Sequence, residues 1–152
     1  MNQASPARWT PHVTVATLVE KDDKFLLVRE QPDGKIVYNQ PAGHLDEGEG
    51  IIGAARRETL EETAWDVEIT GYLGVYRSIA ANGITYLRHG FIARPLRFNG
   101  GQTLDEPIID TAWMSYDEIV EKQNQMRSPM VKQLIDDYHT GLIYPLTLFH
   151  ED

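Results

Sequence analysis

The chain has 152 residues, of which 41% are hydrophobic and 24% charged, and this composition fits one globular domain with its own core. The net charge of −9 argues against sequence-independent binding to nucleic acid or to an anionic membrane, although an anionic small molecule could still bind where its charge is neutralised locally. Because the chain has no cysteine, disulfides, zinc–thiolate sites and thiol nucleophiles are excluded.

The first half of the chain predicts an arm, three strands and a helix. Residues 1–10 are polar and predict an N-terminal arm, followed by one domain over residues 11–152. Residues 13–19, 24–30 and 36–40 predict strands, separated by turns at residues 22–23 and 32–34. A helix is expected after Gly50, with an apolar face made of Ile51, Ile52, Ala54, Ala55 and Leu60.

The second half predicts two long strands and two helices. Residues 67–76 and 84–96 predict the strands, residues 99–110 an acidic loop, and residues 113–114 a short apolar segment. A capping box formed by Ser115 and Glu118 predicts a second helix. Ser128 and Pro129 predict the start of a third helix, which we expect to end near Gly141. This order of elements predicts a single domain of the α+β class.

Three acidic residues of the first helix are the first candidates for a functional site. Glu58, Glu61 and Glu62 project to nearly the same side because residues three and four apart share a helix face. Carboxylates this close repel one another unless a positive charge lies between them, and a hard divalent cation prefers such oxygen ligands. The alternative interpretation is a solvated acidic helix face, which is common.

The spacing around these glutamates is that of a known motif. Gly43 is followed by five residues, Glu49, seven residues, Arg57-Glu58, two residues and Glu61-Glu62, and this pattern resembles the Nudix box of the Nudix hydrolase family. The chain departs from the family pattern at Thr59, Ala64 and Trp65, none of which is a charged position. The resemblance implies an α/β/α sandwich with a mixed β-sheet.

The resemblance also implies metal-assisted chemistry. Hydrolysis of a phosphoanhydride requires neutralised phosphate oxygens and a nucleophilic water, and Mg²⁺ supplies both, with Mn²⁺ as a substitute. Glu58 and Glu62 would grip one ion from consecutive turns, and Glu61 would hold a second ion or the water. In the family a loop carbonyl adds a further ligand, here that of Ala42 or Gly43.

Arg57 and the departures from the motif have structural interpretations. Arg57 is expected to pair with Glu49 and pin the loop to the helix, and the alternative is an ordinary surface pair with Glu61. Thr59 is expected to pack against the sheet or to bond a helix carbonyl. The family glycine that usually ends this helix in a left-handed conformation is Ala64 here, at a cost of roughly 1 kcal/mol unless the helix ends differently.

Segments outside the helix resemble one subfamily, the NudJ-type phosphatases. The residues that carry this resemblance are 38–46, 11–16, Arg127-Ser128-Pro129, Tyr138, Gly141 and Tyr144-Pro145-Leu146. The resemblance implies release of orthophosphate from nucleoside di- and triphosphates, and action on the hydroxymethylpyrimidine pyrophosphate precursor of thiamine. The alternatives are a pyrophosphohydrolase that releases nucleoside monophosphate and pyrophosphate, and a non-catalytic Nudix domain that senses nucleotides.

Several other residues are candidates with competing interpretations. His44 and Arg29 could contact substrate phosphate, or could serve as a loop-stabilising residue and a strand-edge charge. Tyr38, like Tyr76 and Tyr86, could stack on a base or simply pack. Glu106 is the candidate for the extra acidic residue that activates water in many Nudix enzymes. Asp105 and Asp110 are alternatives to Glu106 for this role. For Arg88 and His89, which lie in an apolar strand, a structural role is expected.

The expected partner is a small nucleotide or pyrimidine diphosphate. The charge argues against a nucleic-acid duplex, and no apolar run approaches the ~20 residues needed to cross a membrane. Residues 1–6 lack the apolar core of a signal peptide, so we expect a cytoplasmic protein. Both a monomer and a homodimer are compatible with the sequence.

Overall fold

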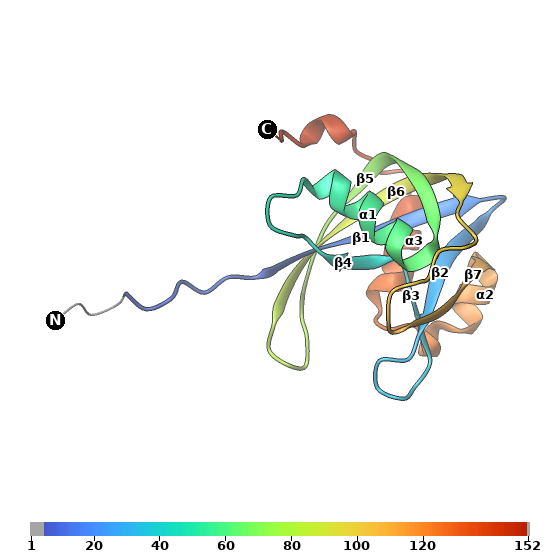
Figure 1. Ribbon diagram of the computed structural model, residues 1–152, viewed down its shortest axis with the longest axis horizontal. Coiled ribbons are helices and arrows are strands. Elements are labelled where there is room, and N and C mark those ends of the chain that lie inside the picture. The colour runs from blue at the N-terminus through green and yellow to red at the C-terminus, as the bar shows by residue number, and fades with distance from the viewer. Residues whose placement is uncertain (1–4, 152) are drawn as a thin grey trace.

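Strand β1, His12–Lys21, lies at the centre of the structure and is buried on both faces. The structure is a computed structural model that describes residues 5–151 (Figure 1), so residues 1–4 of the expected arm lie outside the described residues. Val15 and Val19 pack in one hydrophobic cluster with residues of helix α1, Ile51–Thr63, whereas Ala16 and Leu18 pack in another with residues of α3, Met130–His139. Helices therefore cover both faces of the sheet, which confirms the expected α+β sandwich.

The sheet is mixed, as expected. Its strand order is β3-β2-β1-β6-β5, and β4 and β7 pair in addition with β1 and β2. The β1–β6 pair is parallel, and the remaining pairs are antiparallel. The bounds of the other strands are β2 Lys24–Glu30, β3 Val37–Asn39, β4 Ala42–His44, β5 Trp65–Ile79, β6 Thr85–Phe98 and β7 Ile108–Ser115.

The helix ends follow the predicted chemistry only in part, because α3 begins at Met130 with Pro129 as its N-cap and without a side-chain cap. Helix α2, Tyr116–Glu121, begins with the predicted capping box, in which the Ser115 hydroxyl accepts from the Glu118 N–H. Helix α1 ends at Ala64, which has φ 63° and donates its N–H to the Leu60 carbonyl, so the helix ends left-handed without a glycine. Two short 3₁₀ turns span Gln123–Gln125 and Leu146–Leu148.

Two strands differ from the sequence-based expectation. The predicted loop over residues 99–110 is wrong for its last three residues, because β7 begins at Ile108 and includes the apolar segment 113–114. Pairing with β2, in which Arg29 lies opposite Asp110, stabilises this strand despite its acidic start. The three-residue strand β4 was not predicted; it forms because Ala42, Gly43 and His44 pair with β1.

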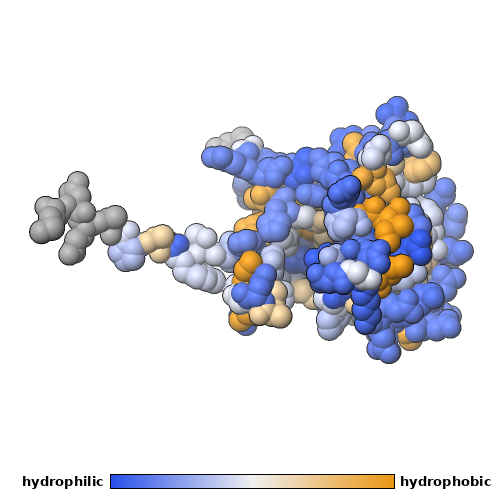
Figure 2. All heavy atoms as spheres, turned by 60° about the horizontal axis from the view of Figure 1, so that its bottom comes forward, coloured by the Kyte–Doolittle hydropathy of each residue, from blue (hydrophilic) through white to orange (hydrophobic). Residues whose placement is uncertain are grey.

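The surface is largely hydrophilic on the face shown in Figure 2, with apolar residues gathered in limited groups. Residues 5–11 carry no helix or strand and project from the body as an extended segment. Within residues 5–151, the structure contains no helix that combines the length and apolar character needed to cross a membrane.

Candidate active site

Two of the three glutamates of α1, Glu58 and Glu62, face strand β4. Glu58 is half-buried and lies directly against Gly43: a Cβ added to that glycine would come within 2.2 Å of the Glu58 carboxylate carbon. A side chain at position 43 would therefore displace the Glu58 carboxylate, whereas glycine lets the backbone of β4 approach it closely.

Glu62 is half-buried and its carboxylate has few partners. Within residues 5–151, it accepts one long hydrogen bond, of 3.4 Å, from the Ala42 N–H to its Oε1. Burial, and next the negative charges of Glu58 and Glu30, raise the pKa of Glu62 to about 9. A buried carboxylate that lacks a compensating charge is expensive, and such groups concentrate at functional sites.

Arg57 joins the loop before α1 to the helix. Its Nε donates to Glu49 Oε2 at 2.5 Å and its Nη2 to Glu49 Oε1 at 3.0 Å, which is the expected clamp. Its Nη1 also donates to Glu58 and Glu61, each at 3.0 Å, so the alternative pair with Glu61 forms as well. The Nη2 bond to the His44 carbonyl, 3.1 Å long, extends the clamp to β4.

The Arg57 side chain also reaches the neighbouring glutamate of the helix. A 100° step around the helix separates Arg57 from Glu58, yet the long arginine side chain bends back far enough to bond the Glu58 carboxylate. The hydrogen bonds from Arg57 lower the pKa of Glu49, whereas burial outweighs Arg57 and raises the pKa of Glu58. Arg57 therefore favours the ionised form of Glu49 in the loop, whereas burial disfavours the ionised forms of Glu58 and Glu62 on the helix.

These features fit a hard divalent cation. Glu58 and Glu62 are carboxylates placed beside a backbone strand that has no Cβ at Gly43, and both lack sufficient positive charge. Within residues 5–151, no three His, Asp or Glu side chains already converge as a ready metal site. The reason is visible in the hydrogen bonds, because Glu58 and Glu61 turn toward the Arg57 guanidinium.

The acidic loop between β6 and β7 brings Asp105 to the site. The Asp105 N–H donates to the Glu61 carbonyl at 3.1 Å, and its charge contributes to the raised pKa of Glu58 and of Glu62. Glu106 is exposed, and Asp110 is held by Arg29. The water-activating role of Glu106 stays a prediction, and Asp105 is the better-placed rival.

The three predicted substrate residues lie on different strands. Arg29 makes two hydrogen bonds to Asp110, of 2.7 and 2.5 Å, and so has a structural partner. His44 is exposed on β4, and its Nε2 lies 3.1 Å from His12 Nδ1. Tyr38 is half-buried and packs against the cluster under α3. Their contact with substrate stays a prediction.

A second group of charged residues adjoins Glu62; sequence reasoning named one of them, Arg88, with a structural role, but did not bring the group together. Glu30 is buried and accepts a 2.8 Å hydrogen bond from Arg127 Nη1. Arg88 Nη2 donates to Asn39 Oδ1 at 3.2 Å and to Gln40 Oε1 at 2.9 Å. No spacing rule could find this group, because Glu30 and Arg127 are 97 positions apart. The only signal was Arg127 itself, as part of an Arg-Ser-Pro segment.

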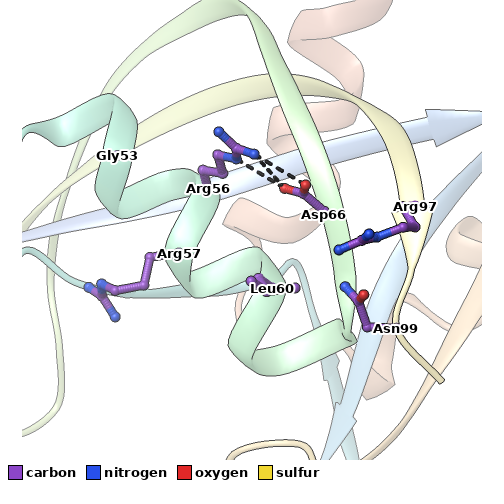
Figure 3. Close-up of a pocket in the computed structure, with 7 residues that line it drawn as sticks. All are labelled: Gly53, Arg56, Arg57, Leu60, Asp66, Arg97 and Asn99. Carbon is purple, nitrogen blue, oxygen red and sulfur yellow. Dashed lines mark hydrogen bonds and ion pairs between the residues drawn. The ribbon is translucent and has the colours of Figure 1, made fainter. Parts of the chain in front are cut away.

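A separate hollow of about 330 Å³ lies on the outer side of α1 and belongs to the scaffold (Figure 3). In it, the Arg56 guanidinium bonds Asp66 of β5 at 2.9–3.1 Å and ties the helix to the sheet. Figure 3 shows Arg57 extending away from this pair. The two adjacent arginines thus serve opposite sides of the helix.

Comparison with known proteins identifies the family. A profile described as NUDIX domain matches residues 9–134. Phosphatase NudJ of Escherichia coli strain K12 is 38% identical over 138 residues, which cover 91% of this chain and 90% of that protein. A NUDIX hydrolase structure from Nitrosomonas europaea is 47% identical with a TM-score of 0.91, covering 94% of this chain and 98% of that one.

A more distant structure shares the fold alone. It is a bifunctional NMN adenylyltransferase/ADP ribose pyrophosphatase from Francisella tularensis, with 22% identity and a TM-score of 0.70 over 90% of this chain and 43% of that one. The profile match and the two nearer relatives carry the assignment, since each spans most of the chain. The protein is therefore a member of the Nudix hydrolase family.

Proposed function

We propose that the protein is a Mg²⁺-dependent phosphatase that releases orthophosphate from nucleoside di- and triphosphates. The observation that carries the proposal is the arrangement of Glu58 and Glu62, two carboxylates short of positive charge, against the Cβ-free backbone at Gly43. A phosphatase is favoured over a pyrophosphatase by the name of the relative that is 38% identical over 91% of the chain. Hydroxymethylpyrimidine pyrophosphate is a further candidate substrate, since it carries the same diphosphate group.

The residues would divide the work as follows. Glu58 and Glu62, with the carbonyl of Ala42 or Gly43, would hold the ion, which supplies Lewis-acid charge and a bound water of lowered pKa. Glu61 would share a second ion or orient the water. Asp105 or Glu106 would accept the proton of that water.

Arg57 has a positioning role in this scheme. It holds the β4 backbone through the His44 carbonyl and the preceding loop through Glu49, so the carbonyl ligands stay in register with the helix. The pair of hydrogen bonds between the planar Arg57 guanidinium and the Glu49 carboxylate gives this junction a defined geometry. Such positioning converts loosely held ligands into a fixed site, which is worth several orders of magnitude in rate.

The experiment that tests the proposal is product analysis with GDP and GTP, with and without Mg²⁺. Orthophosphate from both substrates, only with metal, is the expected result. Pyrophosphate from GTP would instead assign the pyrophosphohydrolase activity. No metal-dependent product from any diphosphate tested, including hydroxymethylpyrimidine pyrophosphate, would favour a non-catalytic nucleotide-sensing role.

A further inference from the structure

Two arginines near Glu62, Arg88 and Arg127, lie close enough for their charges to interact and lack hydrogen-bond acceptors for some of their donors. Arg88 lies on β6, opposite Thr14 of β1 and Tyr76 of β5, and Arg127 lies between the 3₁₀ turn and α3. Burial, and next the neighbouring charge of Arg127, lower the pKa of Arg88 to about 10. Like charges near each other are unfavourable unless anions compensate them, and the carboxylates of Glu62 and Glu30 oppose the effect of Arg127 on Arg88.

Arg88 is placed by contacts from three elements. Its Nη2 donates to Gln40 Oε1, and the fully buried Gln40 in turn donates to the Val131 carbonyl of α3 at 2.6 Å. The Nε of Arg88 is sealed from solvent and has no acceptor in the described structure. A buried donor without an acceptor costs about 1–3 kcal/mol, so a purely structural role for this guanidinium is poorly satisfied.

Arg127 is fixed by its backbone and by one hydrogen bond. Its N–H donates to the Tyr38 carbonyl at 2.7 Å, and its Nη1 donates to Glu30. Half of its side chain remains exposed, and within residues 5–151 its Nε and Nη2 make no hydrogen bond. Arg88 Nη1 likewise makes no hydrogen bond within that range and is not sealed from solvent.

We infer that Arg88 and Arg127 form an anion subsite that holds a phosphoryl group of the substrate beside Glu62. The free donors of two guanidinium groups match the geometry of phosphate oxygens, which arginine recognises in a bidentate manner. Glu30 orients Arg127, and Asn39 and Gln40 orient Arg88. This inference rests on the proposed function, because it names the residues that grip the phosphoryl group next to the metal ligands.

The test is calorimetric titration of inorganic phosphate into the Mg²⁺-loaded protein, which needs no turnover. Arg127→Met should raise the dissociation constant of phosphate about tenfold or more, because charge-assisted hydrogen bonds are lost. Arg77→Met is the matched control, since Arg77 is exposed on β5, makes no ion pair within residues 5–151 and changes the net charge equally. Arg127→Lys should recover part of the affinity, and Mg²⁺ affinity should stay unchanged in all three variants.

Phosphate affinity in Arg127→Met equal to that of the wild type would overturn the subsite, as would a wild-type protein that binds no phosphate at millimolar concentration. Because Arg127 is half-exposed, Arg127→Met is expected to fold. Arg88→Lys is the secondary variant, because Arg88 is packed among polar partners.

The subsite and the phosphatase activity can be tested separately. Phosphate binding that depends on Arg127 without hydrolysis of any diphosphate would remove the phosphatase activity and keep the subsite. Hydrolysis of a diphosphate together with unaltered phosphate binding in Arg127→Met would remove the subsite and keep the phosphatase activity.

Discussion

Glu62 is the residue at which the fold incurs the largest unfavourable electrostatic contribution of the site. Its carboxylate is buried beside Glu58 and Glu30, with one long hydrogen bond from Ala42. An apolar residue of similar size would be more stable there, which indicates that this glutamate is retained for its chemistry. The same argument applies more weakly to Glu58, which receives a hydrogen bond from Arg57.

Replacing Glu62 with glutamine tests its place among the metal ligands. Glu62→Gln keeps the shape and removes the charge, so turnover should fall by about two orders of magnitude or more, since electrostatic groups of a reacting centre typically contribute that much. The fold should be retained, with an unchanged or higher melting temperature, because glutamine is uncharged at this position without having to bind a proton. Glu121→Gln, at an exposed position of α2, is the control and should leave turnover unchanged. Near-normal rates in Glu62→Gln would exclude Glu62 from the ligand set.

The raised pKa of Glu62 predicts that metal binding depends on pH. The pKa of Glu62 in the folded state is about 9, which lies above the usual value for a glutamate. Protonated Glu62 is therefore compatible with the metal-free folded state at low pH, and the stability of that state falls as pH rises toward 9. The ion must displace that proton, so the increase in melting temperature caused by Mg²⁺ should be larger at pH 9 than at pH 6. Thermal unfolding with and without Mg²⁺ across this range measures the difference. An increase that is the same at every pH would contradict the shift.

At the scale of single residues, the sequence predicted the motif positions but not their surroundings. The motif predicted that Arg57 pairs with Glu49, and the structure forms this clamp and extends it to the His44 carbonyl, next to Gly43. Arg88 and Arg127 could not be placed in this way. Their neighbourhood depends on strand register and on the packing of α3, which bring distant segments together.

At the scale of elements, the site is a junction between β4 and α1, and Arg57 is the residue that joins them. Arg57→Met would leave the carboxylates of Glu49 and Glu58 without their partner in a half-buried position. We expect a loss of about 2–3 kcal/mol in the free energy of unfolding, somewhat less than the roughly 3–5 kcal/mol for a broken buried ion pair, because Arg57 is only partly buried. Denaturant titration measures this change.

The adjacent arginine provides the control for this variant. Arg56 makes an exposed ion pair with Asp66, so Arg56→Met should cost less than about 1 kcal/mol. Equal losses of unfolding free energy in Arg57→Met and Arg56→Met would show that Arg57 is an ordinary surface residue and does not act as a clamp.

The end of α1 gives a further prediction. Ala64 has φ 63°, a conformation that glycine adopts without the roughly 1 kcal/mol cost to alanine, but its buried methyl group contributes about 0.8 kcal/mol. These two contributions nearly cancel, so Ala64→Gly should not lower the melting temperature and should leave turnover intact. A large loss of activity in Ala64→Gly would show that the alanine has a role beyond ending the helix.

Elements with strong local signals were predictable, and elements stabilised by pairing alone were not. The turn at residues 22–23 and the Ser115 capping box act through neighbouring residues, so strand β2 and helix α2 were found from the sequence. Strand β4 has three residues, too few for a periodic pattern, and the start of β7 is masked by an acidic loop. Both depend on partners that only the assembled sheet supplies.

At the scale of the whole molecule, the sheet brings arginines close to the acidic site, although the net charge of the protein is −9. Strand β1 pairs antiparallel with β4 and parallel with β6. Glu62, which lies beside β4, and Arg88, which lies on β6, are therefore close enough for their charges to interact. An acidic protein can therefore bind a polyanion at one point, where metal ions and arginines oppose the overall charge. Whether the protein acts as a monomer or a homodimer stays a prediction.

The carboxylates of α1 are expected to support metal-dependent release of orthophosphate. This expectation is tested by measuring orthophosphate and pyrophosphate release from GDP and GTP by the wild-type protein, with Mg²⁺ and with excess chelator. We expect orthophosphate from both nucleotides with Mg²⁺ and none with chelator. Pyrophosphate as the product from GTP, or equal rates with chelator, would contradict it.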